Sequence, residues 1–489
     1  MATLISFAAH LRDLAARGPD APAVTCGERS VSRAELDRAS DALAVAYRGM
    51  GVGVGDMVTL AMPNSVEWFE AAVALWKLGA TPQPVSARLP RRELEAVVDL
   101  ADPVLVLGVD PEVLPGRTCL PAGYAPPPPV GPVDLPDVVS PAWKAPTSGG
   151  STGRPKLIVS GDAGLVDPEV VSTLQFGADG CLVMPGPLHH NGPVVWSCYA
   201  LLHGSHVVVL PRFDAEATLA AVDHHRADVL YLVPTMMKRI WRLPPEVREG
   251  YDLSSLRVVW HLAEPCPPWL KEVWIEWLGP ERILELYAGT EAQLRTVITG
   301  TEWLEHRGSV GRPSGGDVEI CDPEGRPVPT GVEGEVWLRS HRSRPAYRYV
   351  GAEARTRPGG WESLGDMGRL DEDGYLYLGD RSQDMILVGG ANVYPAEVEA
   401  TLTEHPAVLS CAVIGLPDED RGSRVHAIVE ADPETVTLEE LEAFASERLA
   451  SYKRPRSVEF VDSPLRDDAG KVRRARLREE RLAGPGGRP

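Results

Sequence analysis

The segment "CLVMPGPLHHNGP" (residues 181–193) decides the fold, because a short apolar run in it ends abruptly in proline, glycine and histidine. Three later segments share this design. They are "VLYLVPTMM" (229–237), "VVWHLAEPCP" (258–267) and "ILELYAGTE" (283–291). In open α/β sheets the carboxyl ends of parallel strands line the ligand crevice. Each segment alone is typical of a strand followed by a turn, but the four together predict one composite site.

The N-terminal third alternates between apolar runs and helical patterns. "VTLAMPN" (58–64) precedes the helical "SVEWFEAAVALWKLGA" (65–80), and "VLVLG" (104–108) follows. This order predicts a helix-covered parallel sheet. The N-terminus has leucines and a phenylalanine at helical spacing, which predicts an amphipathic helix with Leu4, Phe7, Leu11 and Leu14 on one face.

The character of the chain changes near Asp366. Two turns of the Asp-Gly type between short runs predict antiparallel hairpins in 365–402. A helix that starts at Pro395, a strand over Val408–Leu416, a helix near Leu438–Leu449 and a basic tail follow. We therefore expect a small α+β domain. The predicted division is an N-terminal domain over 1–380, a C-terminal lid domain over 385–489 and a hinge over 379–384.

Composition limits the classes of function. The 489-residue chain carries a formal net charge of -20, which argues against a basic nucleic-acid face and against binding to anionic membranes. No apolar run is long enough to span a bilayer, and the N-terminus lacks the features of a signal peptide. The seven cysteines are scattered without a C-x-x-C pair, which fits a reduced compartment. We expect a cytoplasmic protein with no nucleic-acid partner and no membrane span.

The stretch "APTSGGSTGRPKLIV" (145–159) combines glycines, hydroxyls and one lysine. Glycines let backbone N–H groups crowd round a phosphate, hydroxyls add donors, and a lysine brings a point charge. A flexible surface turn has the same composition, and this stretch alone favours neither interpretation. It is not a Walker loop, because Gly153 is followed by Arg-Pro-Lys.

Six motifs in order give the chain a family resemblance. They are "TSGGSTGRPK", "PLHHNGP", "YAGTE", "GDMGRLDEDGYLYLGDRSQDMI", "GGANVYPAEVE" and "PLRDDAGKVRR". With these motifs nearly the whole chain resembles the adenylate-forming superfamily, and its acyl-CoA synthetase branch most closely. The resemblance implies an α/β fold with a large N-terminal domain of helix-covered parallel sheets plus a barrel-like subdomain. A small mobile α+β C-terminal domain completes the implied fold.

The resemblance also implies the chemistry. A carboxylic acid and ATP form an acyl-adenylate and release pyrophosphate, and the acyl group then passes to a thiol, usually that of coenzyme A. Both substrates of the first step are anions, so positive charge is needed at the α-phosphate. The resemblance assigns this role to Lys471, with Mg²⁺ held near Glu291. An ordinary surface lysine in a basic tail is the alternative for Lys471.

The nucleotide site that the resemblance implies has a phosphate side and a nucleoside side. On the phosphate side it places Thr147, Ser148, Gly149, Gly150, Ser151, Thr152, Gly153 and Lys156. On the nucleoside side it places Glu264, Tyr287, Ala288, Gly289, Thr290, Asp366 and Arg381. Asp366 would accept hydrogen bonds from the ribose hydroxyls with support from Arg381, and Tyr287 would pack against the adenine. Outside this context, an aspartate in a turn and a tyrosine in a core are the simpler interpretations.

The acyl and thiol sides are implied in the same way. His190 would lie between the acyl carboxyl and the thiol path, although "HH" offers two histidines. The expected acyl pocket consists of Asn191, Trp196, Val233, Thr235 and Gly289. The C-terminal domain would rotate about a hinge at Gln383, which withdraws Lys471 and brings in Gly389 and Gly390, where pantetheine passes beside bare backbone.

Four positions depart from the family pattern. Glu264 stands where a small residue is common, Ala288 and Ala292 stand where glycine is common, and Gln383 replaces a charged hinge residue. Neutral drift explains such changes. They also motivate the hypothesis that adenylation is weakened or lost while thioesterification is retained, so that a partner adenylating enzyme supplies the acyl-adenylate.

Two further interpretations stay open. The chain also resembles stand-alone adenylation enzymes that load a carboxylic acid onto the phosphopantetheine of a carrier protein. Within the acyl-CoA synthetase branch it resembles ligases for bulky polycyclic acids, such as bile-acid or terpenoid carboxylates.

Overall fold

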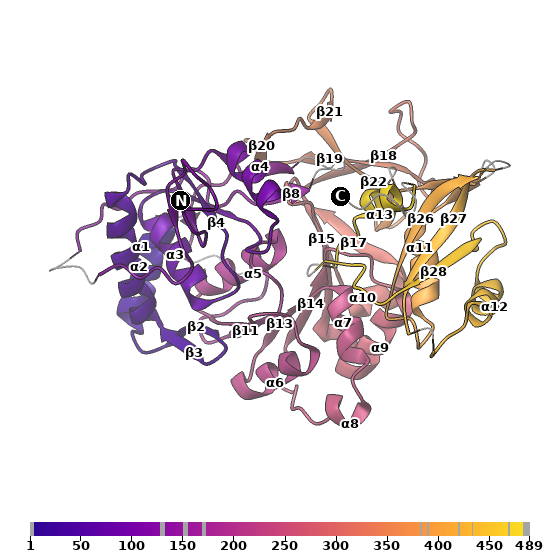
Figure 1. Ribbon diagram of the computed structural model, residues 1–489, viewed down its shortest axis with the longest axis horizontal. Coiled ribbons are helices and arrows are strands. Elements are labelled where there is room, and N and C mark those ends of the chain that lie inside the picture. Colours follow the sequence, from indigo (N-terminus) through magenta and orange to yellow (C-terminus); the bar gives the residue numbers. More distant parts are fainter. Residues whose placement is uncertain are drawn as a thin grey trace.

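The computed structural model describes residues 4–127, 133–149, 155–168, 173–381, 384–388, 391–418, 421–432, 434–467 and 470–482. Figure 1 shows a large N-terminal domain and a small C-terminal domain, coloured orange to yellow, on one side of it. The expected α/β fold with a large and a small domain is confirmed. No helix within the described ranges is long and apolar enough to cross a membrane.

One long sheet forms the centre of the large domain. Its described strands are, in order, β18 (Gly316–Cys321), β19 (Gly334–Ser340), β22 (Trp361–Leu370), β23 (Leu376–Arg381), β17 (Ser309–Ser314), β16 (Arg295–Thr299), β15 (Ile283–Tyr287), β14 (Val258–Leu262), β13 (Val229–Leu232), β11 (Cys181–Met184), β12 (His206–Val209), β2 (Pro22–Cys26) and β3 (Arg29–Ser32), with β21 (Arg355–Arg357) paired to β22. The run from β15 to β2 is parallel, and β16 begins an antiparallel section. The antiparallel strands thus continue the same sheet that contains the parallel run.

The four strands predicted to share one edge do lie together. β11 pairs with β13, β13 with β14, and β14 with β15, all parallel. Every residue of β11, β13 and β14 is buried, which is typical of a parallel sheet covered on both faces. Their carboxyl ends therefore meet at one edge, as the sequence predicts.

The helices of the large domain pack around its sheets. They are α1 (Phe7–Arg17), α2 (Arg33–Gly49), α3 (Val66–Lys77), α4 (Arg91–Ala101), α5 (Asn191–Leu202), α6 (Ala215–His225), α7 (Pro234–Trp241), α8 (Pro245–Arg248), α9 (Pro268–Leu278) and α10 (Gly300–Glu305), with the short turn η1 (Pro280–Arg282). Every residue of α3 except Glu67 is buried, and α3 packs against α1 and α2. The prediction for α1 is wrong at one position. Ser6 caps the helix by accepting from the Ala9 amide, so Leu4 precedes the helix and is exposed.

Smaller sheets complete the large domain. They are the sheet of β5 (Thr81–Pro84), β4 (Met57–Leu60), β6 (Leu105–Leu107) and β7 (Cys119–Leu120), the sheet of β20 (Tyr347–Val350), β9 (Pro155–Ser160) and β8 (Thr147–Gly149), and the pair of β1 (Ile5–Ser6) and β10 (Leu165–Val166). The predicted strands at 58–64 and 104–108 correspond to β4 and β6, which pair in parallel. The sheet that contains β8 and β9 carries the flanks of the expected phosphate loop.

The C-terminal domain has its own elements and its own apolar core. The elements are β24 (Ile386–Val388), β25 (Ala391–Val393), α11 (Pro395–Thr403), β26 (Ser410–Asp418), β27 (Gly422–Glu430), α12 (Leu438–Arg448), β28 (Ser457–Val461) and α13 (Arg474–Leu482). Val398, Val413 and Val429 belong to a core cluster separate from that of the large domain. The helices predicted at Pro395 and at Leu438 are confirmed.

Candidate active site

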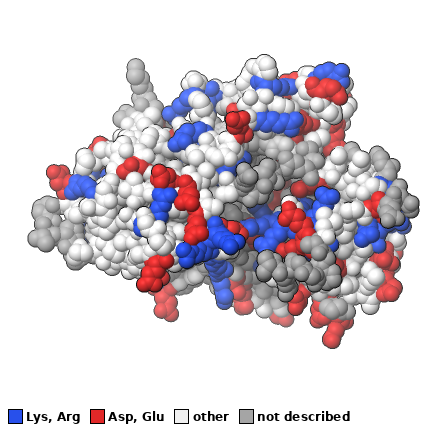
Figure 2. Space-filling model, turned by 45° about the horizontal axis from the view of Figure 1, so that its top comes forward, with Lys and Arg blue, Asp and Glu red and all other residues white. Residues whose placement is uncertain are grey.

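A crevice of about 2570 Å³ opens beyond the carboxyl ends of β11, β13, β14 and β15. Both domains line it, the large one with residues such as His190 and Asp366 and the small one with Lys471. Figure 2 shows basic and acidic side chains crowded together in the middle of the face where the domains meet. The crevice lies where an α/β sheet is expected to bind its ligand.

The phosphate side is built on β8 and β9. Thr147 begins β8, and its hydroxyl accepts a hydrogen bond of 3.2 Å from the Gln83 side chain. Ser148 and Gly149 complete the strand, and Gly149 faces Pro155 of β9 in the register. Gly150, Ser151, Thr152 and Gly153 lie outside the described residues. The structure therefore describes the two strands that flank the predicted phosphate loop, β8 and β9.

Lys156 lies on β9 and faces a carboxylate. Its Nζ is 3.4 Å from Oε1 of Glu291 and 4.0 Å from the ring centroid of Tyr349. The Tyr349 hydroxyl donates to the same carboxylate, and burial together with that carboxylate raises the pKa of Tyr349. Sequence reasoning missed Tyr349, because no motif marks the segment around it.

Glu291 is the carboxylate expected to bind Mg²⁺. It is buried, and the described residues contain no group of three or more His, Cys, Asp or Glu side chains able to hold a metal ion. Mg²⁺ commonly binds one or two carboxylates and completes its octahedron with water and substrate phosphates. A single carboxylate beside the phosphate side fits such an ion, which would neutralise phosphate charge when bound.

The nucleoside side joins two motifs that are distant in the sequence. The Tyr287 hydroxyl donates a hydrogen bond of 2.7 Å to Oδ2 of Asp366. Asp366 of β22 faces Arg381 of β23 in the register, and the Arg381 side chain lies outside the described part. Tyr287 therefore contacts directly the aspartate that is expected to bind the ribose, a contact that the sequence does not predict.

The segment between Tyr287 and Glu291 is tightly placed. A Cβ on Gly289 would lie 2.5 Å from Cδ1 of Leu364 and 3.0 Å from Oε2 of Glu291, so a larger residue would push the ends of these side chains aside. Thr290 lines the crevice, and Ala288 and Ala292 are exposed towards it. Ala292 has φ +54°, a left-handed conformation that glycine adopts more easily than alanine.

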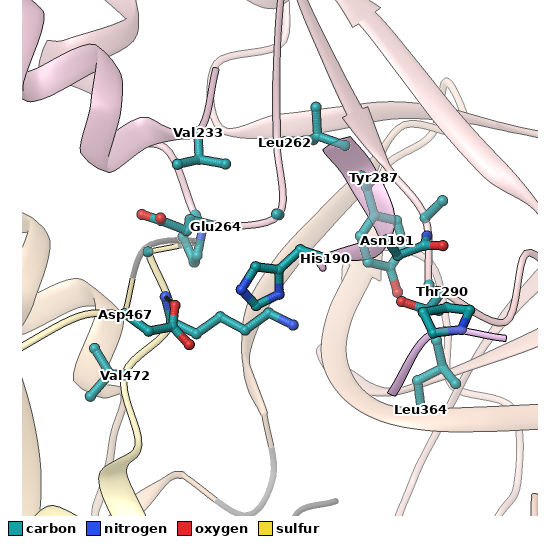
Figure 3. Close-up of a pocket in the computed structure, with 18 of the residues that line it drawn as sticks. His190, Asn191, Val233, Leu262, Glu264, Tyr287, Thr290, Leu364, Asp467 and Val472 are labelled. Carbon is teal, nitrogen blue, oxygen red and sulfur yellow. Dashed lines mark hydrogen bonds between the residues drawn. The ribbon is translucent and has the colours of Figure 1, made fainter. Parts of the chain in front are cut away.

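His190 lies near the centre of the crevice (Figure 3). It precedes α5 as the N-cap residue, and its ring centroid lies 4.4 Å from that of His189. Burial lowers the pKa of His190 well below its usual value, and the positive charges of His189, Lys471 and Arg473 lower it further. His190 is therefore a neutral imidazole at neutral pH, placed beside the lysine of the C-terminal domain.

The turn that carries Lys471 reaches into the crevice. The Lys471 amide donates to the Asp467 carboxylate at 2.9 Å, and Gly470 has φ +78°. A Cβ on Gly470 would lie 1.1 Å from Oε1 of Glu264, so the turn rests directly on that carboxylate. Gln383, Gly389 and Gly390, which the sequence assigns to the hinge and the thiol path, lie outside the described residues.

Glu264 faces the turn and α7. The Thr235 hydroxyl donates to its Oε2 at 2.8 Å, and Oε1 is buried with no hydrogen-bond partner among the described residues. Burial raises the pKa of Glu264 to about 7, which Arg466, the Thr235 hydrogen bond and Lys238 partly oppose. The carboxylate points away from the group of Asn191, Tyr287 and Thr290 in Figure 3. The sequence assigns Glu264 to the nucleotide, whereas in the structure it contacts Thr235, which is expected in the acyl pocket, and the turn that carries Lys471.

The expected acyl pocket is largely apolar. Trp196 and Val233 are buried, and the Trp196 ring packs edge-on against Tyr231 at 5.4 Å and Trp260 at 5.9 Å. The Asn191 side-chain carbonyl accepts a hydrogen bond of 2.7 Å from Nζ of Lys144. Sequence reasoning missed Lys144, which stands just before the phosphate loop in a run without helix or strand periodicity.

Two families match the chain. The family described as AMP-binding enzyme matches residues 11–347, and the one described as AMP-binding enzyme C-terminal domain matches residues 397–471. A feruloyl-CoA synthase of Amycolatopsis sp is 34% identical over 481 residues, which cover 94% of this chain and 96% of that one. The 3-[(3aS,4S,7aS)-7a-methyl-1,5-dioxo-octahydro-1H-inden-4-yl]propanoyl:CoA ligase of Rhodococcus jostii is 32% identical over 518 residues, which cover 94% and 95%.

A solved structure shares the fold over nearly its whole length. The anthranilate CoA ligase AuaEII in complex with anthranoyl-AMP matches with a TM-score of 0.80 and 25% identity, over 97% of each chain.

Proposed function

The chain belongs to the family of AMP-binding enzymes, and from this premise we propose that it forms an acyl-CoA thioester by way of an acyl-adenylate. One observation carries the proposal. Lys156 and Glu291 on the phosphate side, Asp366 on the ribose side and Lys471 from the other domain line a single crevice. Such a crevice suits a carboxyl–AMP anhydride, and the names of the relatives above agree with this chemistry.

In the first half-reaction a carboxylate oxygen attacks the α-phosphorus of ATP, and pyrophosphate leaves with the bonding electrons. The ammonium of Lys471 stabilises the negative charge that develops between the two anions. The Lys156 ammonium binds the phosphates beside Glu291. The Asp366 carboxylate accepts hydrogen bonds from the ribose hydroxyls. The chain thereby orients both reactants, which accounts for a large part of the rate enhancement.

In the second half-reaction the sulfur of coenzyme A attacks the acyl carbon, AMP leaves, and the thiol proton passes to water. This step needs positioning more than charge stabilisation, since a mixed anhydride is already activated. We propose that the C-terminal domain rotates at the hinge over 379–384, with Gln383 at its centre. The rotation moves Lys471 out and brings the segment of Gly389 and Gly390 beside His190.

We further propose that the adenylation half is weakened while the thioesterification half is intact. Ala292, next to the carboxylate on the phosphate side, has a strained left-handed φ. The methyl groups of Ala288 and Ala292 are exposed at the crevice, so they add a steric cost to nucleotide binding beside the backbone strain at Ala292. Glu264 also meets the turn of Lys471 with a carboxylate oxygen that lacks a partner among the described residues. A partner enzyme would then supply the acyl-adenylate.

The two half-reactions can be measured separately. We expect slow pyrophosphate exchange with ATP and free acid, and fast thioester formation from a synthetic acyl-adenylate and coenzyme A. Ala292→Gly and Ala288→Gly should increase exchange about tenfold each, the equivalent of removing about 1.4 kcal/mol of steric cost. Wild-type exchange as fast as thioester formation would refute the weakened half, and failure of both reactions would refute the function. A phosphopantetheinylated carrier protein, offered in place of coenzyme A, tests the alternative acceptor.

A bulky polycyclic acid is the substrate class that we propose. The Rhodococcus jostii relative, whose name contains a two-ring dioxo skeleton, supports this choice, as does the apolar wall of Trp196 and Val233. A screen of acids by mass spectrometry of the thioester product, with the adenylates made chemically, tests it independently of the first half-reaction.

A further inference from the structure

Four lysines of the large domain are less than a tenth exposed, and they fall into two classes. Lys77 donates to the carboxylates of Asp37 and Asp41, and Lys271 donates to that of Glu285. Neither of these lysines lines the crevice. Lys144 and Lys238 do line it, and neither forms an ion pair with a carboxylate of the described residues.

Lys144 is held in place by its backbone. Its carbonyl accepts from the Ser160 amide at 3.0 Å, and the next residue, Ala145, donates to the Pro82 carbonyl at 3.0 Å. The main chain is thereby tied between β9 and β5, and the side chain is only 6% exposed. The Lys144 ammonium is therefore held in a fixed position in the lining of the crevice.

The polar environment of the ammonium is incomplete. An ammonium group has three donors, and one of them meets the Asn191 carbonyl, while the Trp143 ring centroid lies 5.1 Å away. Asp162 contributes a favourable charge but is engaged by Arg342 and Arg344, each at 2.9 Å. Burial lowers the pKa of Lys144 to about 8, so the group is mostly charged at neutral pH. A buried charge without a counter-ion is costly unless a ligand supplies the missing acceptors.

The surroundings indicate which part of a ligand reaches Lys144. Asn191, Val195 and Tyr199 lie one turn apart along α5, and all three line the crevice. The Trp143 and Tyr199 rings pack edge-on with centroids 5.7 Å apart. This aromatic and aliphatic wall suits a hydrocarbon skeleton, whereas phosphates would meet the Lys156 and Glu291 side.

We propose that Lys144 is a specificity-determining residue, which binds a hydrogen-bond-accepting oxygen on the acyl skeleton, away from the carboxyl that reacts. A keto oxygen and a second carboxylate share this chemistry. The inference rests on the proposed function, because it assumes that the acyl half of an adenylate lies along α5. Acyl groups without such an oxygen leave the ammonium with Asn191 as its one acceptor among the described residues, and they bind less tightly.

The test uses stable acyl-adenylate analogues, the 5′-O-(N-acylsulfamoyl)adenosines. One series carries 4-ethylbenzoyl, 4-acetylbenzoyl and 4-carboxybenzoyl groups, and a second carries the same substituents on 3-phenylpropanoyl. Calorimetry gives dissociation constants for the full chain. We expect at least one oxygenated member to bind about tenfold more tightly than its ethyl partner, the discrimination typical of one charge-assisted hydrogen bond. The acetyl and carboxy members distinguish the two oxygen types.

Variants separate recognition from structure. Lys144→Met should abolish the preference, because the oxygenated compounds lose their advantage over the ethyl compounds, while Lys144→Gln, which keeps a donor, should retain part of the preference. Lys238→Met, which removes a buried ammonium near Arg466, should leave the preference unchanged. Thermal unfolding confirms that each variant folds.

Two results would overturn the inference, namely no preference in either series, or an equal loss for all analogues in Lys144→Met. If wild type binds no analogue at all, the proposed adenylate site itself is wrong.

Discussion

At the scale of single residues, two buried lysines are expected to differ in their role: Lys271 stabilises the fold, whereas Lys144 is proposed to bind the acyl group. Lys271→Met should destabilise the protein by about 3–5 kcal/mol, because Glu285 would stay buried without its cation. Lys144→Met removes a charge that has no counter-ion among the described residues, so its free energy of unfolding should be unchanged or rise by about 1–4 kcal/mol. Denaturant titration of both variants measures the contrast. Equal destabilisation of the two would show that Lys144 is an ordinary structural lysine.

Glu264 should make stability depend on pH. Its pKa is raised by burial from 4.5 to about 7, so the folded state binds more protons than the unfolded state between these values. The contribution of Glu264 to the free energy of unfolding is therefore complete below about pH 4.5 and is lost as the pH rises through 7. Glu264→Gln should remove on the order of 2 kcal/mol of this pH dependence and stabilise the protein at pH 8. Urea titrations at pH 5 and pH 8 measure the free energy of unfolding of wild type and variant at each pH. The same change in stability between the two pH values for both proteins would contradict the expectation.

The side chains that the sequence does not reveal depend on contacts between distant segments. Tyr349 meets Glu291 because β20 pairs with β9, and Lys144 meets Asn191 because the irregular segment before β8 lies against the start of α5. The motif residues Tyr287 and Asp366 could be named from the sequence, but not the hydrogen bond between them. Local pattern thus identifies candidates, and topology decides which of them touch.

At the scale of elements, the strands of the crevice could be predicted well. The apolar runs that begin at 181, 229, 258 and 283 become β11, β13, β14 and β15. A short apolar run bounded by turn residues is typical of a buried strand of a parallel sheet. The start of α1 could not be placed as well, because the Ser6 cap competes with the hydrophobic spacing that includes Leu4. A capping hydrogen bond therefore overrides periodicity at a helix end.

The turn before Lys471 offers a test at this scale. Gly470→Ala adds a methyl group that would lie 1.1 Å from Oε1 of Glu264, in a backbone with φ +78°. We expect pyrophosphate exchange to fall about tenfold or more, while thioester formation from a supplied adenylate stays within twofold of wild type, because the proposed mechanism uses Lys471 in the first step alone. The double variant with Glu264→Ala should recover part of the loss. If it recovers nothing, backbone strain and not the contact is responsible.

At the scale of the whole molecule, α7 joins the two domains. The Arg242 guanidinium donates to the carbonyls of Val408 and His405 in the C-terminal domain. Arg242→Ala should shift the population away from the arrangement with Lys471 in the crevice by at least tenfold, since even one hydrogen bond to a charged group contributes about 1.5–3 kcal/mol. Single-molecule energy transfer between labels on the two domains measures the shift. Arg239→Ala, an exposed position on the same helix, is the matched control and should leave the distance distribution unchanged.

The separate apolar core of the C-terminal domain has a consequence for how the protein melts. Val398, Val413 and Val429 pack among themselves and not into the large domain's interior. A unit that holds itself together can open from its neighbour without unravelling, so heating should release it in its own calorimetric peak. The same autonomy would let evolution, or an engineer, exchange this module between relatives and retune one half-reaction while the pocket for the acid stays as it was.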